Sequence, residues 1–140
     1  MPLHVNGILA DANCEGHLAL LLRLFQEGWR HDVWEVLHLT PISLADLGLY
    51  PDASDRAVWE ACQREQVILL TANRNDAGPD SLEATIQQYN TPASLPVFTL
   101  ANEQRVLRDR RYAEAVADRL LKLLFDIDRY RGTGRLYVPS

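Results

Sequence analysis

The feature that most constrains this 140-residue chain is the continuous run "VILLT" at residues 67–71. A strand without regular polar alternation is buried on both faces, which is typical of a parallel sheet covered by helices on each side. The run ends directly in "ANRND" at residues 72–76, so polar side chains follow the apolar ones at once. The sequence therefore predicts a central parallel strand that carries a polar cluster at its carboxyl end.

Strand-like and helix-like segments alternate along the rest of the chain, which favours an α/β fold. Predicted strands are 3–10, 32–40, 67–71 and 96–100, with 131–140 as a further extended segment. Predicted helices are 13–28, 54–66, 80–89 and 109–130. We expect one domain over residues 1–140, built as a three-layer α/β/α sandwich with a mostly parallel sheet of about four strands. Right-handed crossovers then bring the helix N-termini to the carboxyl edge of the sheet.

Several residues are predicted to begin or end these helices. Asp52 is the expected N-cap of the helix at 54–66, with Asp55 at position N3. Asp80 is the expected N-cap of the helix at 80–89, with Glu83 in a capping box. Gly28 is expected to end the helix at 13–28.

Composition excludes several broad classes of protein. The chain is 47% hydrophobic and 24% charged, as in globular domains, and its net charge of −5 argues against broad electrostatic binding to nucleic acid. A signal peptide and a membrane-spanning run are both missing, so we expect a cytoplasmic protein without membrane partners. Cys14 and Cys62 form no metal-binding spacing and are expected to be reduced thiols.

Polar side chains fall where the predicted strands end. Asp11 and Asn13 follow the first strand, Asp55 begins a middle helix, and a third group follows the strand at 67–71. The third group consists of Asn73, Arg74, Asn75 and Asp76. Mg²⁺ is bound by a few carboxylates with water and substrate phosphates, and parallel strands fix the spacing of such carboxylates. Phosphate-binding loops, a nucleophile elbow and zinc-binding histidine spacings are missing.

The segments "ILADANCEG" and "SDRAVWEACQREQVILLTANRND" resemble the PIN-like superfamily, in particular its small bacterial branch related to toxin-type nucleases. The resemblance covers roughly residues 5–76, and it implies an α/β/α fold and a Mg²⁺- or Mn²⁺-dependent ribonuclease. It places Asp11, Asp55 and Asp76 as catalytic metal ligands. Substrate-binding positions are Asn13, Asn73, Arg74 and Asn75. RNA, an antitoxin-like or other protein, and a second copy of the chain are the partners that it implies.

Two positions depart from the family pattern, because Asn73 and Asn75 stand where aspartates are usual. An amide oxygen can bind Mg²⁺ but carries no charge, so each change removes one negative charge and one candidate base. The alternative interpretation is a catalytically degenerate PIN-like module that binds RNA, a protein or a small anion.

Plainer interpretations also fit the same residues. Asp11 can be a helix N-cap, Asp55 can simply complement a helix dipole, and asparagines suit turns. The arginines at 105, 108, 110, 111, 129, 131 and 135 alternate with acidic residues, which favours a solvated helix face over a phosphate-binding surface. The apolar segment "LLKLLF" at 120–125 suits either a core helix or a dimer surface.

Overall fold

The computed structural model describes residues 4–73, 78 and 81–139 of the chain. Its five strands form one all-parallel sheet in the order β2-β1-β3-β4-β5. The strands are β1 (Gly7–Ala10), β2 (Thr40–Pro41), β3 (Val67–Thr71), β4 (Val97–Leu100) and β5 (Arg135–Val138). The α/β class is confirmed, and the expected four strands are corrected to five, because the segment at 131–140 adds β5 beside β4.

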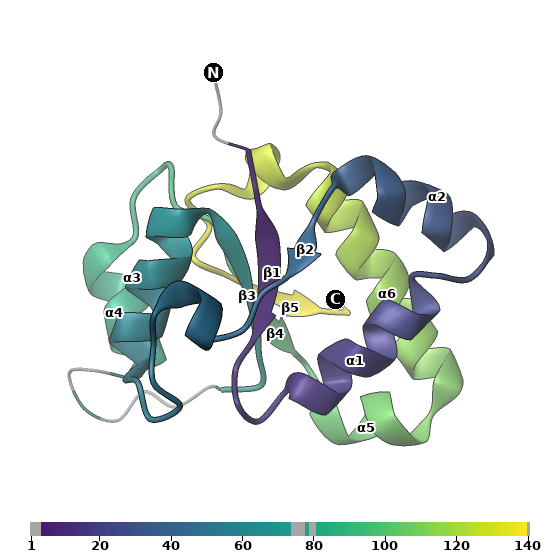
Figure 1. Cartoon of the computed structure of the whole chain (residues 1–140), viewed down its shortest axis with the longest axis horizontal. Coiled ribbons are helices and arrows are strands. Elements are labelled where there is room, and N and C mark those ends of the chain that lie inside the picture. Colours follow the sequence, from purple (N-terminus) through teal and green to yellow (C-terminus); the bar gives the residue numbers. More distant parts are fainter. Residues whose placement is uncertain (1–3, 74–77, 79–80, 140) are drawn as a thin grey trace.

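Helices lie on both sides of this sheet (Figure 1). The α-helices are α1 (Glu15–Leu24), α2 (Gly28–Leu37), α3 (Asp55–Glu65), α4 (Leu82–Tyr89), α5 (Glu103–Arg108) and α6 (Arg110–Phe125). Two 3-10 helices are η1 (Ala45–Leu47) and η2 (Ile127–Tyr130). In Figure 1, α3 and α4 lie on one side of the strands, and α1, α2, α5 and α6 lie on the other. Within the described ranges, every helix is too short or too polar to span a bilayer.

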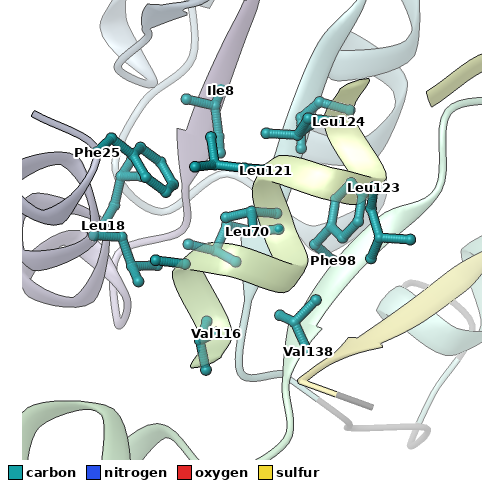
Figure 2. Close-up of a cluster of buried hydrophobic side chains, with 14 of the residues drawn as sticks. Ile8, Leu18, Phe25, Leu70, Phe98, Val116, Leu121, Leu123, Leu124 and Val138 are labelled. Atoms are coloured by element: carbon teal, nitrogen blue, oxygen red, sulfur yellow. The ribbon is translucent and has the colours of Figure 1, made fainter. Parts of the chain in front are cut away.

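Each face of the sheet has its own apolar cluster, because successive side chains of a strand point to opposite faces. The α6 face carries Ile8, Ala10, Ile68, Leu70, Phe98 and Leu100, packed against α1 and α6. The α3 face carries Leu9, Val67, Leu69 and Val97, packed against α3 and α4. Figure 2 shows the α6 face, where Leu121, Leu123 and Leu124 lie among strand side chains. The segment "LLKLLF" is thus mainly a core segment, although Phe125 itself is exposed.

The predicted strand at 32–40 is wrong, since residues 28–37 form the helix α2 and only Thr40–Pro41 form β2. Trp34 is a buried residue of α2, and its ring stacks on that of Phe25, with the ring centroids 4.9 Å apart. Val33 and Leu37 are partly buried beside the same cluster, at the i−1 and i+3 positions of a helix face. The β-branched and aromatic residues that suggested a strand therefore serve helix packing instead.

The predicted caps are shifted along the chain. Ser54 caps α3 by accepting a hydrogen bond from the Ala57 N–H, so Asp55 is the first helical residue and Asp52 is not the cap. Ser81 caps α4 in the same way, with Ala84 as donor, instead of Asp80. The helix α1 ends at Leu24, and Gly28 begins α2 rather than ending α1.

The short strand β2 approaches β1 closely at Gly7. A Cβ atom added to Gly7 would lie 2.5 Å from both the Thr40 carbonyl oxygen and Ile42 Cγ1, so this approach requires glycine. After Ile42 donates its N–H to the Ile8 carbonyl, the chain leaves the sheet toward η1. Since β2 ends early, residues 43–53 are free to line the carboxyl end of β1.

The expectation that all crossovers are right-handed is also wrong. The connection from β3 to β4 passes over the α3 face through α4, and that from β4 to β5 passes over the α6 face through α5 and α6. Both move the chain one strand in the same direction across the sheet, so their hands are opposite. The connection to β5 therefore does not cover the α3 face of β4 and β5. This face lies beside the first turn of α4.

Candidate functional site

The candidate site lies at the carboxyl ends of β1 and β3. The chain leaves β1 toward β2 on one side, whereas β3 lies on the other side, so the strand order changes direction between them. Ligands of parallel α/β sheets bind outside the strand ends at such a switch point. A cavity of about 140 Å³ opens there. It is lined by Asp11, Ala12, Asn13, Leu44, Pro51, Ala53, Asp55, Val58, Leu69, Thr71, Asn73 and Leu82.

The cavity brings together four of the seven predicted site residues, namely Asp11, Asn13, Asp55 and Asn73. The other three, Arg74, Asn75 and Asp76, lie outside the described residues. The site is thus a pocket with two carboxylates and two side-chain amides, drawn from β1, α3 and the end of β3.

Asp11 is fixed from two sides. Its Oδ2 accepts a hydrogen bond from the Thr71 hydroxyl at the end of the neighbouring strand, and its Oδ1 accepts one from the Asn13 N–H at 3.2 Å. The N-cap position of α1 belongs to Cys14, so the N-cap interpretation of Asp11 is wrong. These contacts hold the carboxylate at the pocket wall and leave lone pairs on both oxygens for a ligand.

Asp55 links the end of β3 to the start of α4. Its Oδ2 accepts hydrogen bonds from Asn73 Nδ2 at 2.9 Å and from the Leu82 N–H at 3.1 Å. Leu82 is the first residue of α4, where backbone N–H groups need an acceptor and a negative charge is favoured. Asp55 therefore has a structural role, which its Oδ2 fills as acceptor of both hydrogen bonds.

Asn73 connects the two carboxylates through Thr71. Its backbone N–H donates to Thr71 Oγ1 at 2.9 Å, and the same hydroxyl donates to Asp11. Its side-chain amide donates to Asp55, and its backbone carbonyl accepts from Arg135 Nη1 at 2.8 Å. At this position the chain thus has an amide that serves as donor to a carboxylate, and not a carboxylate of its own.

Sequence reasoning missed two residues of this network, Thr71 and Arg135. Thr71 follows the buried Leu69 by two positions, as Asp11 follows Leu9, so each polar side chain lies on the same face of the sheet as the leucine before it. This spacing was the signal in the sequence that could have identified Thr71. Arg135 is one of the seven arginines for which the sequence favours a solvated helix face, and no neighbouring residue in the sequence distinguishes it from the others. Its contacts with Glu83, Asn73 and Thr99 lie 36–62 residues away along the chain.

Arg105 and Arg110 agree with the solvated-face interpretation, whereas Arg131 pairs with Asp128 although only 11% of its side chain is exposed. Arg105 binds Asp109, and Arg110 binds both Glu27 and Glu114, all on the exposed surface. Exposed pairs of this kind contribute only about 0–1 kcal/mol each. They nevertheless neutralise charge that a phosphate-binding surface would need.

The two cysteines are free thiols, as predicted, and both are buried. Burial raises the pKa of Cys62 to about 12, and burial together with the nearby Asp11 charge raises the pKa of Cys14 to about 12 as well. Both sulfurs are therefore protonated at neutral pH and are poor nucleophiles or metal ligands.

The donors in the pocket suit a hard divalent cation, because carboxylate and amide oxygens are the ligands that Mg²⁺ and Mn²⁺ take. Within residues 4–73, 78 and 81–139, no three Asp, Glu, His or Cys side chains are grouped so as to hold a metal ion. Of the residues that line the cavity, Asp11 and Asp55 are the carboxylates, so a two-metal centre would need further ligands.

Comparisons with models of protein families, with curated proteins and with solved structures found no match to this chain.

Proposed function

We propose that the chain is a PIN-like α/β/α domain whose pocket binds one Mg²⁺ or Mn²⁺ ion through Asp11 and Asp55 and hydrolyses RNA. The observation that carries this proposal is the meeting of these two carboxylates in one cavity at the switch point of a parallel sheet. The first-strand aspartate, the helix aspartate and the polar strand end match the positions of the PIN-like pattern.

In this proposal each residue of the pocket has a separate role. Asp11 and Asp55 supply the negative charge that holds the cation, and Asp76 is the third ligand that the sequence pattern adds. Asn13 is exposed beside the pocket and offers amide hydrogen bonds to a phosphate. A bound ion supplies Lewis-acid activation of water and stabilises charge that develops on the phosphate.

A second candidate is a PIN-like module that binds RNA, a protein partner or a small anion without catalysis. The observation that favours it is the internal hydrogen bonding of the pocket, in which Asp11 and Asp55 already accept four donors. A pocket so bonded is stable without a cation. In addition, Asn73 is neutral, whereas the PIN-like pattern has a negatively charged aspartate at this position for a two-metal mechanism.

Replacing Asp11 by Asn tests the proposal, with Asp32→Asn as the matched control. Asp32 is exposed on α2, outside the pocket, and its replacement removes the same charge. We expect Asp11→Asn to weaken Mn²⁺ binding by about 100-fold or more, because even supporting residues of metal sites contribute about 10–100-fold. Electron paramagnetic resonance of free Mn²⁺ gives the affinity.

Cleavage of a labelled single-stranded RNA, with Mn²⁺ or with EDTA, then separates the two candidates. Cleavage that requires Mn²⁺, persists in Asp32→Asn and disappears in Asp11→Asn supports the nuclease. Mn²⁺ binding without cleavage supports the non-catalytic module. A wild-type protein that binds no Mn²⁺ at millimolar concentration would rule out the cation site.

A further inference from the structure

Arg135 is the first residue of the edge strand β5, and its side chain extends toward β3 to the edge of the pocket. Its Nη1 donates to the Asn73 carbonyl oxygen at 2.8 Å and to Thr99 Oγ1 at 2.7 Å. Its Nε and Nη2 donate to Glu83 Oε2 at 3.1 and 2.9 Å. Only 7% of the side chain is exposed. The guanidinium is therefore held on three sides, and its planar fork fixes the positions of those partners.

Asn73 and the first turn of α4 are each held twice, once by a negative and once by a positive group. Asp55 binds the Asn73 side chain and the Leu82 N–H, and Arg135 binds the Asn73 carbonyl and the Glu83 carboxylate. A shift of Asn73 away from Arg135 would carry its side-chain amide away from Asp55. Asp55 and Arg135 are thus linked through Asn73 and through the first turn of α4, although the two side chains share no hydrogen bond in the structure.

We propose that Arg135 is a positioning residue of the pocket, which acts through Asn73 to orient Asp55 for cation binding. The cation-binding part rests on the proposed function, whereas the coupling from Arg135 through Asn73 to Asp55 does not. Glu83 compensates the charge of Arg135, so the guanidinium can lie near the site without cancelling the charge of Asp55.

Arg131 supplies a matched control. It is another arginine with little exposure, at 11% of its side chain, and it donates to a carboxylate and to a backbone carbonyl, those of Asp128 and Ala93. Neither partner lines the pocket. Arg131→Lys thus removes guanidinium hydrogen bonds to a carboxylate and to a carbonyl while it keeps the positive charge, as Arg135→Lys does.

The test uses ¹H–¹⁵N nuclear magnetic resonance of the metal-free chain, followed by Mn²⁺ titration. We expect both variants to lower the melting temperature, since each loses hydrogen bonds of a guanidinium. Only Arg135→Lys should move the Asn73 side-chain amide and Leu82 backbone amide resonances and speed hydrogen exchange at Leu82. It should also weaken Mn²⁺ binding by about tenfold, whereas Arg131→Lys should leave the affinity unchanged.

A second variant, Thr99→Val, removes one acceptor of Arg135 without touching the pocket lining. It should move the same two resonances in the same direction by a smaller amount. If Asn73 and Leu82 stay in place in folded Arg135→Lys and in Thr99→Val, the positioning role is overturned. If the resonances move but the wild type binds no Mn²⁺, the coupling stands and the proposed cation site fails.

Discussion

The two faces of the sheet differ at the carboxyl ends of their strands. On the α6 face the inward positions stay apolar to the last residue, with Ala10, Leu70 and Leu100 at the ends of β1, β3 and β4. On the α3 face, the apolar residues Leu9, Leu69 and Val97 are followed two positions later by Asp11, Thr71 and Thr99. One face thus serves packing over its whole length, and the other changes from packing to a polar site.

The difference shows how one sheet can combine stability with a polar pocket. Buried polar groups cost free energy unless they are hydrogen-bonded, and Thr71, Thr99 and Arg135 on the α3 face are all bonded. The apolar cluster on the α6 face is the larger of the two and supplies packing that the site does not. Substitutions in the α6-face cluster should therefore change stability without changing the chemistry of the site.

The largest expected effect on folding stability comes from Phe98→Ala on the α6 face. Phe98 is fully buried in the middle of this cluster (Figure 2), and loss of its ring should lower the free energy of unfolding by about 3–5 kcal/mol. Urea denaturation measures the loss. Mn²⁺ affinity of the folded fraction should stay unchanged, and a loss of affinity like that of Asp11→Asn would show that the two faces are not independent.

A smaller loss of stability is expected for Asp55→Ala on the α3 face. The change leaves Asn73 Nδ2 and the Leu82 N–H without their acceptor, which costs about 1–3 kcal/mol. Asp52→Ala, an exposed aspartate just before α3, is the control and should change stability by less than about 0.5 kcal/mol. Equal urea midpoints for the two variants would contradict the link from Asp55 to β3 and α4.

The smallest expected effect distinguishes the two thiols. Burial comes first among the causes that raise the pKa of Cys14, and the Asp11 charge comes next, whereas burial is the cause for Cys62. Asp11→Asn should therefore lower the pKa of Cys14 and leave that of Cys62 in place. Cysteine ¹³Cβ shifts followed upward from about pH 8 report both thiols, and an equal change at Cys62 would contradict the assignment.

The same thiols set a direction for alkaline stability. Their pKa values are raised from the ordinary 9.0 to about 12 in the folded chain. Because the folded state holds these protons more tightly than the unfolded state, the associated stability is fully present below pH 9 and is lost as pH rises toward 12.

The elements with strong internal patterns could be predicted from the sequence. The strand β3 has the predicted bounds, and the helix α3 agrees to within a residue, because continuous apolar runs and 3.6-residue periods are local signals. The segment at 32–40 failed because Val33, Trp34 and Val36 favour strands in general, while contacts with Phe25 and with α6 decide the helix here. The strand propensity of a residue reflects how well its side chain packs on a half-buried surface. A half-buried helix such as α2 offers the same kind of surface.

The site was predictable only as far as its residues lie at strand ends. Asp11 follows β1 directly and Asn73 is the second residue after β3, so the topology of the neighbouring strands brings them together. The role of Asp55 as acceptor for the start of α4 depends on the packing of two helices and has no local signal. Arg135 needs three partners from distant segments, which a single sequence does not reveal.

The place of Arg135 in the chain has a consequence for synthesis. Residues that line the pocket end at Leu82, whereas the guanidinium that holds Asn73 belongs to the last strand. A nascent chain that has released only its first hundred residues therefore carries both carboxylates, but its Asn73 lacks the guanidinium that binds the carbonyl oxygen. With Arg135 in the proposed positioning role, the pocket should reach its final geometry only when residues beyond 130 have left the ribosome and joined the edge of the sheet, so protein synthesis itself should delay the finished site.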